Sequence, residues 1–278
     1  MDLLKRIGEA AAYIQSTCSN QPLIGVILGS GLGGFTEEMK IDQEIDYADI
    51  PHFPVSTVEG HSGKMLIGSI GGKTIITLSG RFHYYEGYST EEVVFPIRVL
   101  QKMGIKNLMI TNAAGGTNTS FKVGDLMVIK DHISFAIVNP LIGKNIESLG
   151  TRFPDMSEPY SKKLIAKAHN IAKQHGFELK EGVYFGVTGP SFETRAEYKL
   201  IHHLGADAVG MSTVQEVITA VHAGMQVFAI SVITDIGVRE EDNIISHKDV
   251  LDAANAAAPK LTAVLTSMIQ SFEHASYI

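Results

Sequence analysis

The segment Leu23-Ile24-Gly25-Val26-Ile27-Leu28-Gly29-Ser30-Gly31 decides the fold, because it joins an apolar run to a tight glycine turn. The run from Leu23 to Leu28 has the length and composition of a buried β-strand. A strand that ends in Gly29-Ser30-Gly31 exposes backbone N–H groups and a hydroxyl to the crevice beyond it, which suits an anion. A glycine turn that binds no ligand is equally compatible with this motif alone, so a second signal is needed.

A cationic loop after another apolar strand supplies that second signal. The strand Thr74 to Leu78 runs into Ser79-Gly80-Arg81-Phe82-His83, which places a guanidinium and an imidazole just beyond the strand end. Arginine can contact two phosphate oxygens at once. Because ligands of open α/β sheets collect beyond the carboxyl ends of strands, we expect both loops to face one crevice and one phosphate.

Short apolar runs alternate with helical patterns along the whole chain, which is typical of a sheet covered by helices. The patterns predict helices near 4–14, 93–103, 162–175, 195–204 and 213–223 and from an N-cap at 246, and strands at 23–28, 64–70, 73–78, 108–111, 182–187 and 227–233. Gly71-Gly72 joins two of these strands as a hairpin, so the sheet is mixed. The sequence therefore predicts an α/β fold, a single domain over residues 1–278 with a central mixed β-sheet flanked by helices.

Composition excludes several classes of protein. A chain of 278 residues with 45% apolar residues is long enough for one large α/β domain, and a net charge of −7 argues against a general nucleic-acid binder. The single cysteine, Cys18, excludes an intramolecular disulfide framework, and no cluster has zinc-ligand spacing. No segment approaches the ~20 apolar residues of a membrane span, and the segment Met1 to Arg6 is expected to begin an amphipathic helix, without the long apolar h-region or cleavage site of a signal peptide. We expect a cytoplasmic protein without a metal that binds neither nucleic acid nor membrane.

Further candidate site residues cluster where strands end. Asn112-Ala113-Ala114-Gly115-Gly116 has side chains small enough for a flat or anionic ligand to approach the main chain, or is a compact turn. Phe192 and Glu193 can stack on a heterocycle and accept its N–H protons, although Glu193 also suits the first turn of a helix. Ser212 is either an N-cap or a phosphate ligand, and His247 is either structural or part of the site.

Six segments together resemble the trimeric family of purine nucleoside phosphorylases, in order and spacing, over nearly the whole chain. They are Gly-Ser-Gly-Leu-Gly at 29–33, Val-Glu-Gly-His at 58–61, Gly-Arg-Phe-His-Tyr-Tyr-Glu-Gly-Tyr at 80–88, Thr-Asn-Ala-Ala-Gly-Gly at 111–116, Gly-Pro-Ser-Phe-Glu-Thr at 189–194 and Val-Gly-Met-Ser-Thr at 209–213. The resemblance implies a homotrimer that carries out reversible phosphorolysis of purine (deoxy)ribonucleosides in purine salvage. The products would be free base and (deoxy)ribose 1-phosphate, with inorganic phosphate as co-substrate and no cofactor.

The resemblance also implies roles for individual residues. Phosphate would be bound by Ser30, His61, Arg81, His83, the Ala113 backbone and Ser212. The nucleoside would be bound by Tyr85, Phe192, Glu193, Met211, Asp235 and His247, and by Phe135 lent from a neighbouring subunit. Among these, His83, Glu193 and Asp235 are the expected catalytic residues.

Asp235 departs from the family pattern, because members specific for 6-oxopurines have asparagine there. An ionised carboxylate would repel O6 and accept from a 6-amino group, whereas a protonated carboxyl could donate. Glu193 suits the N1–H of hypoxanthine or guanine, so inosine and guanosine are the first expectation. The alternatives are a phosphorylase that prefers 6-aminopurine nucleosides (adenosine or methylthioadenosine), and a non-catalytic nucleoside-binding regulator without phosphate ligands.

Overall fold

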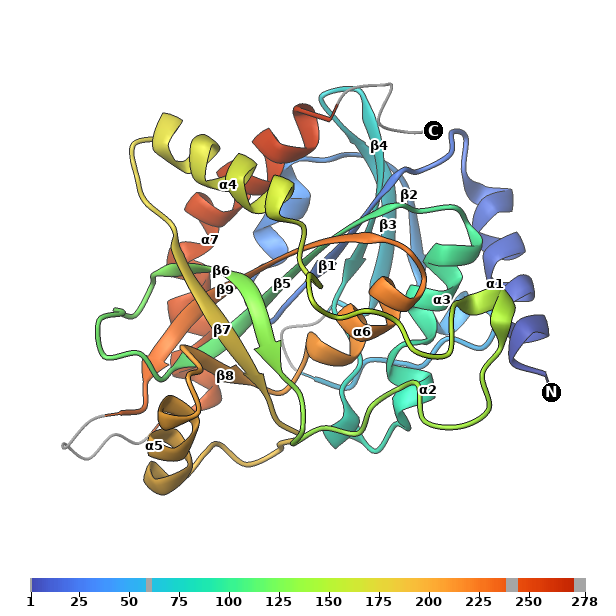
Figure 1. Ribbon diagram of the computed structural model, residues 1–278. Coiled ribbons are helices and arrows are strands. Elements are labelled where there is room, and N and C mark those ends of the chain that lie inside the picture. Colours follow the sequence, from blue (N-terminus) through green and yellow to red (C-terminus); the bar gives the residue numbers. More distant parts are fainter. Residues whose placement is uncertain (1, 59–61, 239–244, 273–278) are drawn as a thin grey trace.

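The strands of the computed structural model, which describes residues 2–58, 62–238 and 245–272, join one nine-stranded mixed sheet (Figure 1). The strands are β1 (Ile24–Leu28), β2 (Lys40–Asp46), β3 (Lys64–Ile70), β4 (Lys73–Ser79), β5 (Asn107–Gly116), β6 (Leu126–Ile133), β7 (Lys180–Gly186), β8 (Ala208–Gly210) and β9 (Gln226–Ile236). The helices are α1 (Leu3–Thr17), α2 (Thr90–Val93), α3 (Phe95–Lys102), α4 (Lys162–Gln174), α5 (Arg195–His203), α6 (Val214–His222) and α7 (His247–Gln270). Short 3₁₀ turns lie at η1 (Gly33–Glu38), η2 (Tyr47–Asp49), η3 (Tyr84–Glu86) and η4 (Glu147–Leu149).

The order of strands places four carboxyl ends at one edge of the sheet. β1 pairs in parallel with β4 on one side and β5 on the other, and β5 also pairs in parallel with β9. β2, β3 and β4 form an antiparallel meander, in which the predicted hairpin is confirmed with Ile70 opposite Lys73. The pairings β5–β8, β8–β7, β7–β6 and β6–β9 close a ring with β5–β9. The predicted mixed sheet is thus confirmed.

β5 is longer than the sequence predicts. The segment 112–116, one of whose interpretations was a compact turn, continues the strand and pairs with β9 from Asn112 opposite Ser231 to Gly116 opposite Ile236. The turn interpretation is wrong because the ladder with β9 outweighs the weak strand propensity of alanine and glycine. Small residues are needed here, since a Cβ at Gly116 would lie 2.7 Å from the Ile236 side chain. The sequence analysis also missed β2, β6 and β8.

The predicted helices are confirmed, with one break. Ser246 caps α7 through its side chain, and Gly176 and Gly205 follow α4 and α5 with positive φ. The predicted helix over 93–103 is divided at Val94 into α2 and α3, with Pro96 in the first turn of α3. In Figure 1, α4 and α7 lie together on one side of the sheet, while α1, α2, α3 and α6 gather on the other.

Apolar side chains from both helical layers bury the sheet in one large core, and a second, smaller cluster around Phe185 and Tyr198 packs beneath α5. The largest fully buried side chains include Phe35, Phe95 and Phe228, each from a different part of the chain. A closely packed core of this kind holds the strand ends, and the side chains that they carry, in defined positions. In the part of the chain that the structure describes, no helix has both the length and the apolar character needed to cross a membrane.

Candidate active site

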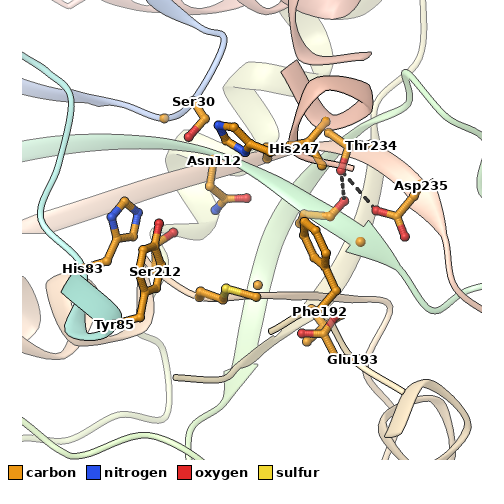
Figure 2. A pocket seen from close by; sticks show the side chains of 18 of the residues that line it. Ser30, His83, Tyr85, Asn112, Phe192, Glu193, Ser212, Thr234, Asp235 and His247 are labelled. Atoms are coloured by element: carbon orange, nitrogen blue, oxygen red, sulfur yellow. Dashed lines mark hydrogen bonds between the residues drawn. The ribbon is translucent and has the colours of Figure 1, made fainter. Parts of the chain in front are cut away.

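A cavity opens at the carboxyl ends of β1, β4, β5 and β9, where the sequence predicts a ligand (Figure 2). It has an empty volume of about 670 Å³, including its open mouth. Eleven of the predicted site residues line it: Ser30, Arg81, His83, Tyr85, Ala113, Phe192, Glu193, Met211, Ser212, Asp235 and His247. Phe135 does not line this cavity, and His61 falls outside the described residues.

The glycine turn after β1 brings Ser30 to the cavity. Gly29 packs directly on β5, since a Cβ there would lie 2.8 Å from Asn112 Cα and 2.9 Å from the Thr111 carbonyl oxygen. The Gly29 N–H donates to Thr111 Oγ1 at 3.0 Å, which ties the turn to the neighbouring strand. The turn is followed by the 3₁₀ helix η1. The hydroxyl of Ser30 is therefore positioned by a turn that only glycine at position 29 allows.

Arg81 forms the cationic centre of the cavity and is 3% exposed. Its guanidinium donates to Ser212 Oγ at 2.7 Å and to the Thr111 carbonyl at 2.7 Å. Its Nε lies 3.4 Å from Oε1 of Glu216, whose side chain is 5% exposed. A buried cation needs such an anionic partner to offset its desolvation. Glu216 thus orients Arg81 through its Nε atom. The sequence analysis did not identify Glu216 as a site residue.

Ser212 and Thr213 lie beneath the guanidinium at the start of α6. The N-cap residue of α6 is Thr213, whose side chain makes no capping hydrogen bond, so Ser212 is not the N-cap that one interpretation required. Thr213 has φ of 72°, a strained value for a β-branched residue. Its hydroxyl accepts from Asn112 Nδ2 at 2.9 Å and from Arg81 at 3.4 Å. These contacts hold the strained turn in place.

His83 is oriented by Glu86, three residues later. The Nδ1 atom of His83 lies 2.9 Å from Glu86 Oε1, and the Glu86 carboxylate also accepts from the Thr57 N–H at 2.9 Å and the Thr57 hydroxyl at 2.6 Å. Burial opposes ionisation of Glu86, but the hydrogen bonds from His83 and Thr57 outweigh it and lower its pKa to about 2. Burial lowers the pKa of His83. A neutral imidazole that donates from Nδ1 leaves Nε2 as an acceptor.

The opposite end of the cavity is acidic and aromatic. Figure 2 shows Phe192, Glu193 and Asp235 on one side, away from His83 and Ser212. Asp235 is 7% exposed and accepts from the Tyr198 hydroxyl at 3.0 Å. Burial, and then the charge of Asp235, raise the pKa of Glu193. This end offers acceptors and a flat ring to a heterocycle.

Three further residues line the space between the two ends. Tyr85 stacks on His83 with ring centroids 4.6 Å apart, and burial raises the Tyr85 pKa to about 12, so its phenol stays protonated. Met211 lies next to Gly189, a residue of the loop that precedes α5. His247 is the first residue of α7 and reaches the cavity from the helix N-terminus.

Phe135 belongs to a different surface. It is 71% exposed, packs edge-on against Phe185 and lines a separate hollow beside α5. Phe153 is another strongly exposed phenylalanine, at 85%, and lines a third hollow together with Arg152 and His132.

Sequence reasoning missed three residues that the structure brings to the site: Glu86, Tyr198 and Glu216. The spacing His83-x-x-Glu86 is a local signal that could have been found, because residues three apart meet in one turn. Tyr198 and Glu216 occupy apolar faces of α5 and α6, where their neighbours in sequence give no sign of a polar partner. Among residues 2–58, 62–238 and 245–272 no group of three or more acidic, histidine or cysteine side chains is arranged to hold a metal ion.

Comparisons with known proteins agree with this geometry. The family model described as the phosphorylase superfamily matches residues 23–270. The purine nucleoside phosphorylase 1 of Bacillus subtilis is 47% identical over 268 residues, covering 96% of this chain and 99% of the relative. A crystal structure of isoform 2 of purine nucleoside phosphorylase from Schistosoma mansoni, in complex with cytosine and ribose-1-phosphate, has a TM-score of 0.93 at 41% identity, with 97% of each chain covered. The Schistosoma mansoni purine nucleoside phosphorylase in complex with adenosine has a TM-score of 0.92 at 40% identity, covering 97% of this chain and 98% of that one.

Proposed function

We propose that this chain, which belongs to the phosphorylase superfamily and within it to the purine nucleoside phosphorylases, cleaves purine (deoxy)ribonucleosides reversibly with phosphate. The products are free base and (deoxy)ribose 1-phosphate, and the proposed process is purine salvage. One observation carries the proposal: a single cavity has a cationic end built on Arg81 and an acidic, aromatic end built on Phe192, Glu193 and Asp235. The cationic end suits the phosphate anion, and the acidic, aromatic end suits a flat purine with N–H donors.

The cationic end is the proposed phosphate site. Arg81 supplies the charge, and the hydroxyls of Ser30 and Ser212 supply polar contacts at its two sides. Since the neutral His83 offers Nε2 as an acceptor, it suits a phosphate oxygen that carries a proton. The Ala113 backbone completes the proposed set, together with His61, which lies outside the described residues.

The nucleoside would lie across the rest of the cavity. Tyr85 and Met211 are the proposed ribose contacts, and His247 is the proposed partner of the 5′-hydroxyl. Phe192 would stack on the purine, while Glu193 and Asp235 would bind its N1, 6-position and N7 edge. This orientation directs C1′ of the ribose toward the phosphate end.

The reaction follows from where charge develops. As the glycosidic bond stretches, the sugar becomes oxocarbenium-like and the purine gains electron density. Phosphate is both the nucleophile that forms the new C1′–O bond and the anion that stabilises the cationic sugar. Holding phosphate and nucleoside in one oriented cavity can contribute roughly 7–11 kcal/mol in the most favourable intramolecular reactions. Inorganic phosphate is the co-substrate, and the proposed reaction uses no metal and no organic cofactor.

A homotrimer in the cytoplasm is the proposed assembly, with one subunit lending a phenylalanine to its neighbour's ribose site. Phe135 at 71% and Phe153 at 85% are the most exposed phenylalanines of the described residues, so they are the two candidates for this ring. Phe135 is the lent phenylalanine that the sequence predicts, and Phe153 is the second candidate for the same role.

Measuring base release with and without phosphate tests the proposed activity. Inosine, guanosine and adenosine are incubated with the wild-type protein, and free base and ribose 1-phosphate are quantified together. Phosphorolysis requires equal amounts of both products and no release without phosphate. Equal release in phosphate-free buffer would indicate a nucleosidase, and binding of nucleoside without any release would indicate the regulatory alternative.

A further inference from the structure

Tyr198 is a buried phenol that contacts the carboxylate at the base end of the cavity. Its hydroxyl donates to Asp235 Oδ2 at 3.0 Å, and the two residues are 3% and 7% exposed. Two glycines make room for it: a Cβ at Gly115 would lie 2.5 Å from the Tyr198 hydroxyl, and a Cβ at Gly237 would overlap its ring. The ring is thus held in one position by backbone that approaches from both sides.

The second oxygen of Asp235 has a hydroxyl beside it as well. Thr234 Oγ1 lies 3.2 Å from Asp235 Oδ1 and 3.2 Å from the Ala114 carbonyl oxygen. A carboxyl group that receives hydrogen bonds is stabilised in its ionised form, in which it is only an acceptor. The Tyr198 hydroxyl, at 3.0 Å from Oδ2, is the closer of these two hydroxyls and the one that comes from another element, α5.

Glu193 is the second carboxyl group at the same end of the cavity as Asp235. Burial raises the pKa of Glu193, while hydrogen bonding by its own backbone and by Tyr198 opposes this shift and the charge of Asp235 adds to it. Burial, and then the charges of Asp235 and Glu193, raise the pKa of Tyr198 well above 10.0, so its phenol remains a donor. When two carboxyl groups share one cavity, one ionises and the other retains a proton more readily. Of the two carboxyl groups, Asp235 is the one that accepts from the Tyr198 hydroxyl at 3.0 Å, and this contact favours its ionised form.

We propose that Tyr198 is a specificity-determining positioning residue, which holds Asp235 as an acceptor for the 6-amino group of a purine, so that the cavity takes adenosine as well as inosine. The proposal rests on the phosphorylase activity proposed above. A 6-aminopurine donates from its amino group to ionised Asp235, and its N1 accepts from protonated Glu193. A 6-oxopurine instead donates from N1–H to ionised Glu193 and gains from a protonated Asp235, the state that Tyr198 disfavours.

The test is the ratio of kcat/KM for inosine to that for adenosine in four variants. Tyr198→Phe keeps the ring that fills the space beside Gly237 and removes only the donor. We expect the ratio to rise by about tenfold or more, the factor that one hydrogen bond to a charged group contributes. Asp235→Asn should raise the ratio as well, and Tyr198→Phe added to Asp235→Asn should change it by no more than about threefold, because Tyr198 acts through Asp235.

Tyr160→Phe is the matched control, since Tyr160 is equally buried and its hydroxyl lies 3.0 Å from His132 Nδ1, away from the cavity. Its ratio should equal that of the wild type, and the KM for phosphate should stay unchanged in Tyr198→Phe. A loss of the two activities in equal proportion would show that Tyr198 is only structural and overturn the proposal. Equal effects of Tyr198→Phe with and without Asp235→Asn would overturn it as well.

Calorimetric binding of adenine and hypoxanthine provides a measurement that needs no turnover. Tyr198→Phe should weaken adenine relative to hypoxanthine by about tenfold or more. A wild-type protein that binds hypoxanthine and not adenine would overturn the inference. If the wild type released no base from any nucleoside, the proposed activity would fail, and the two base affinities would still decide the role of Tyr198.

Discussion

Replacing Arg81 with alanine separates what the guanidinium does for phosphate from what it does for the fold. The side chains of Arg81 and Glu216 are 3% and 5% exposed, and their closest atoms, Nε and Oε1, are 3.4 Å apart. Arg81→Ala therefore leaves a buried carboxylate without its cation. It also removes the hydrogen bonds to Ser212 and to the Thr111 carbonyl.

Both expected losses are large. Removing one partner of a buried ion pair costs about 3–5 kcal/mol in the free energy of unfolding. Each hydrogen bond from the guanidinium to phosphate is worth about 1.5–3 kcal/mol. Two such bonds correspond to a fall in kcat/KM for phosphate of about 100-fold or more, at 1.36 kcal/mol for each factor of ten.

The double variant Arg81→Ala/Glu216→Gln distinguishes the two losses. A neutral amide in place of Glu216 no longer leaves a buried charge unpaired, so about 2 kcal/mol or more of stability should return. The phosphate defect should persist, because no cation has been restored. Glu216→Gln alone keeps Arg81 and should weaken phosphate binding less than Arg81→Ala does.

Urea unfolding at one subunit concentration and phosphate-dependent base release from inosine measure the two quantities on the same samples. If the double variant regained wild-type kcat/KM for phosphate, the defect of Arg81→Ala would be one of packing, and the anion site would lie elsewhere. If Arg81→Ala unfolded with wild-type free energy, the ion pair with Glu216 would not support the fold.

Three further outcomes are expected. Against the effect of burial, hydrogen bonds from His83 and Thr57 lower the pKa of Glu86 from 4.5 to about 2, and after solvent screening this shift contributes about 1–2 kcal/mol, which is fully present above pH 4.5 and is lost as pH falls toward 2; the stability difference between wild type and Glu86→Gln in urea unfolding should shrink over that window, and a constant difference would contradict the assignment. Gly29→Ala should destabilise the protein by about 1–3 kcal/mol because its Cβ meets the β5 backbone, whereas Gly33→Ala, which has nothing within 4 Å of its Cβ, is the control, and equal melting temperatures would refute the contact. Sedimentation should show three subunits, and whichever of Phe135→Ala and Phe153→Ala raises the KM for nucleoside identifies the lent ring; a fully active monomer would exclude both.

Much of this protein could be predicted from local sequence. Helix ends followed from caps and glycines, because Ser246 and Gly176 satisfy or terminate a helix through atoms a few residues away. Strand ends that carry Ser30, Arg81 and His83 followed from apolar runs that stop at glycine. Since the carboxyl ends of parallel strands share one edge of the sheet, the sequence alone predicts that those loops face one cavity.

Pairing partners distant in sequence decided the rest. The segment 112–116 has the composition of a turn, and only the ladder with β9 makes it a strand. Val94 divides a helix that periodicity alone predicts to be continuous. Local propensity is weaker than tertiary hydrogen bonding and packing in such segments, so the sequence analysis was wrong where these two disagree.

For the chemistry of the site, too, local sequence predicts some features and only the packing of distant elements determines the others. Residue types and their order in the sequence determined that the cavity joins a cation to carboxylates, because the motifs that carry Arg81 and Glu193 are local. Only the tertiary structure decided which groups control them: Glu216 on α6 reaches Arg81, and Tyr198 on α5 reaches Asp235 on β9. Contacts between side chains 37 or more positions apart depend on how elements pack, which no local pattern encodes.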